Sequence, residues 1–110
     1  TRTDVFTVAP RVLINNSASQ TYSLVEINAR DRAGLLHKVT RALTQLGLQI
    51  SSALVTTYGE RVVDVFYVKD TFGMQVTHVG KLDQIRKTVL EVITENEVVV
   101  DDVKSIKIAS

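Results

Sequence analysis

Two long runs rich in β-branched residues are separated by only two residues, Gly59 and Glu60. The first run is LQISSALVTTY, residues 48–58, and the second is RVVDVFYVKD, residues 61–70. A glycine-led link of two residues between β-rich runs is typical of a β-hairpin. The chain is therefore predicted to contain a long antiparallel pair of strands, and its fold has to accommodate that pair.

Segments with helical periodicity lie on both sides of this hairpin. In residues 33–46 the apolar side chains recur at three- and four-residue spacing, and Gly47 follows as a helix terminator. The apolar face predicted for this helix consists of Leu35, Leu36, Val39, Ala42, Leu43 and Leu46. Residues 81–95 form a second helical pattern, whose apolar face is Leu82, Ile85, Val89, Val92 and Ile93. Residues 21–29 alternate and are predicted to form a strand ahead of the first helix.

The order of these elements indicates one fold class. Strand, helix, strand, strand, helix and a strand-like end is the order of the ferredoxin-like βαββαβ unit. We therefore predict an α+β sandwich, with an antiparallel sheet and two helices on one of its faces. In that topology residues 48–58 form an edge strand, which can pair with another chain. Residues 11–15 and residues 98–108 compete for the fourth sheet position, and the sequence leaves both open.

The chain divides into three parts. Residues 1–20 are a leading extended segment that Pro10 interrupts, residues 21–95 carry the pattern of one domain, and residues 96–110 are a tail of unknown role. A chain of 110 residues is long enough to bury a core of its own. Because it opens at Thr1 and not at a methionine, we expect it to be a piece of a longer protein.

Charge and composition argue against several classes of function. The 13 basic and 12 acidic residues give a formal net charge of +1, too balanced for a basic nucleic-acid face or a polybasic membrane patch. The absence of cysteine removes disulfides, thiolate metal sites and cysteine nucleophiles. No apolar run reaches the length of a membrane span. We expect a cytoplasmic protein that binds neither nucleic acid nor membrane.

The residue pattern assembles no catalytic or metal-binding set. His37 and His78 have no partner histidine at ligand spacing, and His37 falls on the polar face of the first helix. Asp101 and Asp102 are adjacent, and adjacent residues of a strand point to opposite faces. We therefore expect no catalysis, no metal and no cofactor in this chain.

The turn into the first helix, within ARDRAGLLHKVTRAL from Ala29, does not follow the usual rules for a helix start. Asp31 stands where a capping side chain belongs. Arg32, however, would put a cation at the positive end of the helix dipole, and Gly34 would weaken the first turn by about 1 kcal/mol. Such strain often marks function, because glycine lets a ligand approach and helix N–H groups attract a carboxylate. Two interpretations stay open, a capped helix start and a receptor for a zwitterion such as an amino acid.

The segments NARDRAGLLHKVTRAL and GLQISSALVTTYGERVVDVFYVKD resemble the ACT domain, a small-ligand regulatory module. More narrowly, they resemble the C-terminal ACT domain of the bifunctional PII uridylyltransferases / uridylyl-removing enzymes. The resemblance extends to APRVLINNSAS and DTFGMQV and covers about residues 5–93. It implies a ferredoxin-like fold, side-by-side pairing with a second ACT unit through the edge strand, and a ligand bound between paired units.

The resemblance also implies a function. It points to an amino-acid-sensing regulatory domain with glutamine as the effector. High glutamine would favour removal of uridylyl groups from the PII nitrogen regulatory protein by the parent enzyme, and low glutamine would favour uridylylation. The parent's nucleotidyltransferase and HD hydrolase domains would precede this chain, and the parent would depend on magnesium. This chain itself is not expected to be an enzyme.

Candidate ligand contacts follow from the same resemblance. On the turn they are Asn28, Asp31, Arg32, Ala33, Gly34, Leu35 and Leu36, and at the start of a partner's edge strand they are Gln49, Ile50 and Ser51. Many ACT domains carry asparagine where Gln49 stands, so the amide is kept. An exposed polar residue on an alternating edge explains Gln49 equally well. The alternative from another functional class is an ACT module that pairs domains and binds no ligand.

Overall fold

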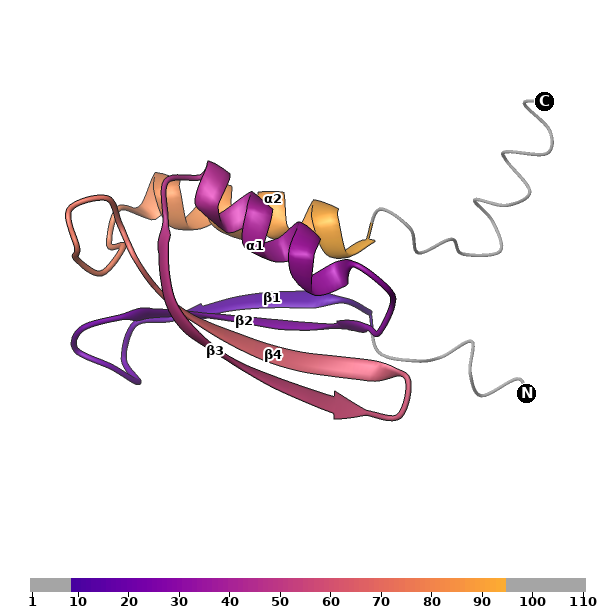
Figure 1. Cartoon of the computed structure of the whole chain (residues 1–110). Coiled ribbons are helices and arrows are strands. Elements are labelled where there is room, and N and C mark those ends of the chain that lie inside the picture. Colours follow the sequence, from indigo (N-terminus) through magenta and orange to yellow (C-terminus); the bar gives the residue numbers. More distant parts are fainter. Residues whose placement is uncertain (1–8, 95–110) are drawn as a thin grey trace, which may run out of the picture.

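The computed structural model describes residues 9–94 of the chain, and six elements follow one another in this part (Figure 1). They are β1 (Arg11–Asn15), β2 (Ser23–Arg30), α1 (Leu35–Gln45), β3 (Gln49–Tyr58), β4 (Arg61–Lys69) and α2 (Val79–Thr94). The strands form one antiparallel sheet in the order β1-β2-β4-β3. This architecture confirms the predicted α+β, ferredoxin-like fold.

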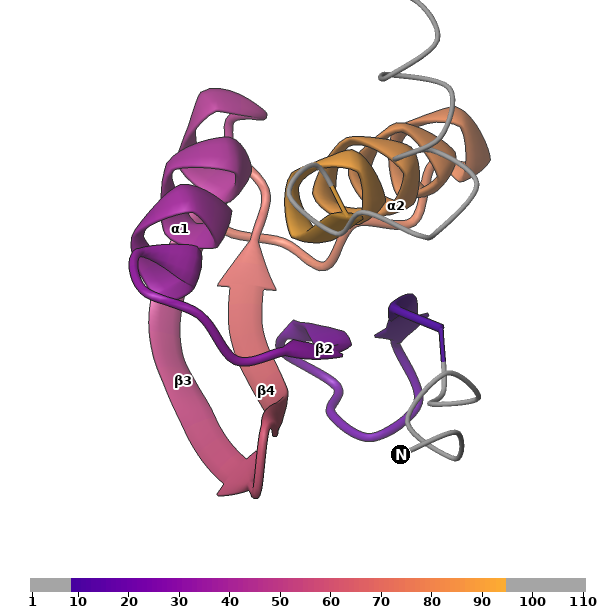
Figure 2. The same cartoon turned by 90° about the vertical axis from the view of Figure 1, so that its right-hand side faces the viewer.

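Both helices lie on the same face of the sheet, as the end-on view shows (Figure 2). Helix α2 packs on β1 and β2, α1 packs on β3, and the two helices contact each other. The core lies between the helices and the sheet. Its largest fully buried apolar side chains are Phe66, Ile27, Leu43, Ile85, Ile93, Val25, Val39, Val68 and Val89.

The two central strands alternate strictly between buried and partly exposed residues. In β2 the buried row is Ser23, Val25, Ile27 and Ala29, and in β4 it is Val62, Asp64, Phe66 and Val68. Alternation of this kind places one row of side chains under the helices and leaves the other on the uncovered face of the sheet. Each row under the helices contains one polar residue, Ser23 or Asp64.

The two edges of the sheet are β1 and β3. Arg11 lies opposite Asn28 and Asn15 lies opposite Leu24, so part of the leading extended segment belongs to the sheet. Within the described residues, β1 therefore occupies the sheet position that the sequence left open, and the competing residues 98–108 lie outside that part. The expected edge position of β3 is confirmed.

The predicted hairpin is also confirmed. Strand β3 ends at Tyr58 and β4 begins at Arg61, and these two residues lie opposite each other across a two-residue link. Gly59 has φ +60, a left-handed conformation that glycine adopts without a steric penalty. We call the end of the sheet that carries this link the hairpin end. At the opposite end, the loop end, the segment after β1 meets the connector between β4 and α2 (Figure 1).

Candidate functional site

Helix α1 begins later than the sequence indicated. Its first residue is Leu35, and Gly34 is the N-cap, with φ +80 and ψ −1. This is the left-handed region, which glycine reaches at little cost and other residues reach at about 1–2 kcal/mol. The interpretations that Asp31 caps the helix and that Gly34 lies inside its first turn are therefore wrong, and Arg32 lies before the helix. Gly34 is needed to turn the chain into the helix.

The start of α1 has no side-chain cap. The Leu35 amide donates to the Arg32 carbonyl at 3.2 Å, and the Lys38 amide donates to the Gly34 carbonyl at 3.0 Å. Between them, the amides of Leu36 and His37 donate to no group in the described part of the chain. Two N–H groups at the positive end of the helix dipole are thus available to an acceptor from outside.

Asp31 and Arg32 serve the neighbouring elements. The backbone amide of Asp31 donates to the Glu60 carbonyl at 2.7 Å, which ties the turn to the hairpin link. The Arg32 guanidinium donates to the Ile93 carbonyl at 2.6 Å. A cation at the C-terminal end of α2 is favourable for its dipole, which explains why an arginine is tolerated next to the start of α1.

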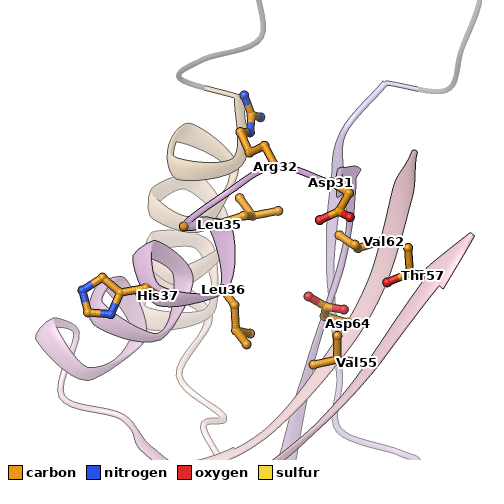
Figure 3. A pocket seen from close by; sticks show the side chains of 10 residues that line it. Asp31, Arg32, Leu35, Leu36, His37, Val55, Thr57, Val62 and Asp64 are labelled. Atoms are coloured by element: carbon orange, nitrogen blue, oxygen red, sulfur yellow. The ribbon is translucent and has the colours of Figure 1, made fainter. Parts of the chain in front are cut away.

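An open hollow of about 450 Å³ lies between the start of α1 and the hairpin strands (Figure 3). Its lining residues are Asp31, Arg32, Gly34, Leu35, Leu36, His37, Val55, Thr57, Val62 and Asp64. In the close view the carboxylates of Asp31 and Asp64 lie on the sheet side of the hollow, opposite Leu36, and the His37 ring points outward. A volume of this order is within the range of small-molecule sites.

Leu36 is a correction to the predicted helix face. The sequence pattern placed it among the buried residues, but its side chain is 44% exposed and lines the hollow. Leu35, Val39, Ala42 and Leu43 form the buried face instead. The late start of α1 leaves Leu36 at the margin of that face.

Asp64 lines the hollow, and the sequence reasoning did not single it out. It is only 2% exposed, and its Oδ1 atom has no hydrogen-bond partner. Burial raises the pKa of the Asp64 carboxyl; a backbone hydrogen bond from Thr56 opposes that rise, and the nearby charge of Asp31 adds to it. The available signal was an acid in a row of alternating buried residues, since its neighbours in that row are Val62, Phe66 and Val68.

Five of the predicted contacts lie outside the hollow. Asn28 is on the sheet face away from the helices, where its Oδ1 accepts a hydrogen bond from Arg61 Nε at 3.1 Å. Gln49 is at the loop end, and its side-chain amide donates to the Asp70 carbonyl at 3.0 Å. Ile50 and Ser51 follow it in β3, and Ala33 is an exposed turn residue. The turn and residues 49–51 are thus at opposite ends of one sheet, and their meeting across two units stays a prediction.

Among residues 9–94 no three His, Cys, Asp or Glu side chains are grouped so that they could hold a metal ion. In the same part of the chain, neither helix has the length and apolar character needed to cross a membrane.

Comparison with known proteins places the chain in a family. The family model described as the ACR family N-terminal ACT domain matches residues 18–96. Among curated proteins, the bifunctional uridylyltransferase/uridylyl-removing enzyme of Azospirillum brasilense is 60% identical over 94 residues, which are 86% of this chain and 10% of that protein. The same enzyme of Rhodospirillum rubrum is 58% identical over 94 residues, again 86% and 10%. That of Gluconobacter oxydans is 54% identical over 87 residues, 79% of this chain and 9% of that protein.

The chain therefore spans about a tenth of the length of these relatives. No solved structure matches it. The predicted C-terminal position of this domain within a parent enzyme stays a prediction. Family match and fold agree with each other, and both agree with the resemblance drawn from the turn and the hairpin. The chain belongs to the ACT-domain family of regulatory domains, and its similar relatives are bifunctional uridylyltransferase/uridylyl-removing enzymes.

Proposed function

We propose that this chain is an amino-acid-sensing regulatory domain, with glutamine as its effector and the hollow beside Gly34 as the ligand site. The observation that carries the proposal is the start of α1. There the left-handed Gly34 leaves the amides of Leu36 and His37 uncapped over the hollow. A pair of N–H groups at a helix N-terminus is a natural receptor for the carboxylate of an amino acid.

The rest of the hollow complements the other parts of such a ligand. Asp31 and Asp64 supply negative charge for an ammonium group, and Leu35, Leu36 and Val55 supply apolar surface for methylene groups. An amino acid is a zwitterion, so a site with N–H donors at one side and carboxylates at the other matches both of its charges. Glutamine adds a side-chain amide, for which Thr57 is the nearby polar group.

In a parent enzyme this site would report nitrogen status. The similar relatives are named as bifunctional enzymes that add and remove uridylyl groups. We propose that glutamine in the hollow favours removal of uridylyl groups from the PII protein, and that an empty hollow favours their addition. The catalytic, magnesium-dependent domains and the cytoplasmic setting would belong to the parent chain.

Pairing with a second ACT unit is part of the same proposal. Nearly every residue of β3 is exposed, including the large apolar residues Leu54, Val55 and Tyr58. A long exposed edge strand with apolar side chains is a template for another strand. Side-by-side pairing through β3 would also bring Val55 and Thr57, and with them the hollow, next to the partner unit.

The test is a thermal-unfolding series of the 110-residue chain with millimolar glutamine. A ligand that binds only the folded state raises the melting temperature at concentrations above its Kd, by an amount set by the logarithm of the concentration ratio. We expect glutamine to raise it more than glutamate, alanine or lysine do at the same concentration. If none of these amino acids shifts it, the sensor function is contradicted.

The alternative is an ACT module that only pairs domains, and the exposed apolar residues of β3 are the observation that favours it. Sedimentation and thermal unfolding, measured with and without amino acid, together distinguish the two functions. A pairing module changes its association with protein concentration alone. A sensor changes its melting temperature with an amino acid, whether or not it associates.

A further inference from the structure

The hollow is lined in part by the carboxylate of Asp64, which has an acceptor oxygen that receives no hydrogen bond. Asp64 projects from β4 toward α1, and only 2% of its surface is exposed. Its Oδ1 atom has no hydrogen-bond partner. A buried carboxylate oxygen without a partner is destabilising, so natural proteins rarely keep one without a use.

We infer that Asp64 is the group that holds the ammonium of an amino acid in this hollow, so that one chain by itself binds both charged ends of the ligand. This inference rests on the proposed function and adds to it. It names the ammonium partner, and it moves that partner from the turn, where sequence reasoning looked, to a central strand. It also removes the need for a second unit to complete the main-chain contacts.

Asp31 is the competing carboxylate, and its environment makes it the weaker anchor. Asp31 is exposed, and an exposed ion pair contributes little because water screens it. A charge pair that is withdrawn from water is stronger, and removing one partner of such a pair is costly. Asp31 still adds negative charge at the mouth of the hollow, since it is near enough to raise the pKa of Asp64.

A metal ion fits Oδ1 less well than an ammonium group does. Calcium and magnesium require about six or more oxygen ligands, and among residues 9–94 two carboxylates line the hollow. The side chains nearest to them include the apolar Leu35, Leu36, Val55 and Val62. An ammonium group needs two or three acceptors and tolerates adjacent methylene groups, which matches this lining.

The placement of N–H donors and carboxylate on opposite sides of the hollow supports the same assignment. The uncapped amides of Leu36 and His37 and the Asp64 carboxylate line one hollow from opposite sides, helix and sheet (Figure 3). An α-amino acid placed there turns its carboxylate to the helix and its ammonium to the sheet. All α-amino acids carry this carboxylate and ammonium pair, so contacts to the side chain must distinguish glutamine from the others.

The direct test is isothermal titration of the 110-residue chain and of its Asp64→Asn variant with L-glutamine. We expect Asp64→Asn to weaken binding at least about tenfold, because it removes a charge-assisted hydrogen bond worth about 1.4 kcal/mol or more. Asp83→Asn is the matched control. Asp83 is on α2, where it pairs with Arg86 and Lys87 at the surface, and we expect its variant to bind like the parent chain.

A second measurement does not depend on the fold of the variant. 4-Carbamoylbutanoic acid is glutamine without its ammonium group, and N-acetylglutamine has that group blocked. Both should bind the parent chain at least about tenfold more weakly than glutamine. A tripeptide with a free N-terminus tests the other source of a primary ammonium. If it binds more tightly than every free amino acid, the ligand is a peptide end and the assignment to an amino acid is overturned.

The pH dependence of binding is the third readout. An ammonium group pairs with the ionised carboxyl, so affinity should rise with pH through the pKa of Asp64 and then level off. The charged and titratable groups that line the hollow around Asp64 are Asp31, Arg32 and His37. A rise that persists unchanged in Asp64→Asn would belong to another group and would overturn the inference.

The outcomes separate this inference from the proposed function. Glutamine binding that Asp64→Asn leaves unchanged overturns the role of Asp64 and leaves the sensor function standing. Equal binding of glutamine and 4-carbamoylbutanoic acid also overturns the role of Asp64 and leaves the sensor function standing. If no amino acid binds the parent chain, both are overturned. Loss of binding in Asp64→Asn alone, with Asp83→Asn unaffected and both variants folded by circular dichroism, supports both.

Discussion

Among residues 9–94, Ser23 and Asp64 are the two polar residues buried beneath the helices, and they differ in how far their hydrogen-bonding groups are satisfied. Ser23 Oγ donates to the Asn16 side-chain carbonyl and accepts a hydrogen bond from the Val76 amide at 2.9 Å. Asp64 is buried to the same degree, yet its Oδ1 has no partner. Ser23 thus completes a hydrogen-bond network inside the fold, whereas Asp64 lines the hollow with a carboxylate oxygen that has no partner.

The same contrast extends to the two ends of the sheet. At the loop end the two N–H groups of the Gln75 side-chain amide are shared among three carbonyls, those of Asn16, Ser19 and Tyr22, at 3.1, 2.6 and 2.8 Å from Nε2. Asn16 also donates to the Val76 carbonyl at 2.7 Å. At the hairpin end two helix amides are uncapped and the surface is hollowed. One end is therefore closed by its own polar groups, and the other is suited to receive an external one.

The largest effect on stability is expected at the closed end. Ser23→Ala would leave the Val76 amide and one acceptor of Asn16 without a partner, so we expect the free energy of unfolding to fall by about 2–3 kcal/mol. Urea denaturation measures this change. Ser52→Ala, on the exposed face of β3, is the control and should change stability by less than about 0.5 kcal/mol. An equally small effect of Ser23→Ala would break the contrast.

The two glycine turns offer a matched pair, one at each end. Gly34 and Gly73 have φ +80 and +79, and a Cβ on either would meet nothing within 4 Å. We expect Gly34→Ala and Gly73→Ala to lower the free energy of unfolding by a similar amount, about 1–2 kcal/mol, because each puts a side chain in the left-handed region. Only Gly34→Ala should also weaken glutamine binding in calorimetric titration. Equal loss of binding in both variants would mean that the turn is not the site.

Asp64→Asn should act on stability in the direction opposite to Ser23→Ala. Burial raises the pKa of Asp64 in the folded chain above its ordinary value of 3.8. The folded state therefore binds more protons, and the free energy of unfolding falls as pH rises from 3.8 through the folded pKa. Above it the buried carboxylate is charged and destabilising. We expect Asp64→Asn to be more stable than the parent chain at pH 7 and to lose this advantage toward pH 4. Thermal unfolding across pH measures it, and a less stable variant at pH 7 would contradict the account.

The smallest effect on folding is expected at the two edges, where assembly is the readout. Leu54 on β3 and Leu13 on β1 are both large, apolar and about half exposed, at 58% and 49%. Lysine at either position should change the free energy of unfolding by less than about 0.5 kcal/mol. If β3 is the pairing edge, Leu54→Lys should lower self-association in sedimentation equilibrium and Leu13→Lys should not. The reverse result would assign pairing to β1.

Much of this fold was predictable because it depends on local signals. Gly59 and Glu60 between two β-rich runs predicted the hairpin, and three- and four-residue spacing predicted both helices. The helix boundaries were less accurate, since the first was expected at residue 33 and begins at Leu35. The sequence could not decide whether residues 11–15 or residues 98–108 fill the sheet position beside β2, because strand pairing depends on contacts between distant parts of the chain.

The site was predictable only in part, and the reason is physical. Arg32 and Gly34 are unfavourable residues for a helix start, and together with Asp31 they indicated a site at the turn. The hollow does lie beside this turn. The hydrogen bonds of Asp31 and Arg32 could not be predicted, since their partners Glu60 and Ile93 are distant in sequence. Asp64 was missed because a single acid in an alternating strand becomes unusual only when the opposite helix buries it.

The central claim is that an amino acid binds at the hairpin end within one chain, and amide chemical shifts test it most directly. In a titration of the 15N-labelled chain with L-glutamine, we expect the largest saturable shifts at Gly34, Leu36, His37 and Asp64. Residues 49–51 and the loop-end amide of Val76 should move little in comparison. Saturable shifts that concentrate at residues 49–51, or no saturable shifts at any of these amides, would contradict it.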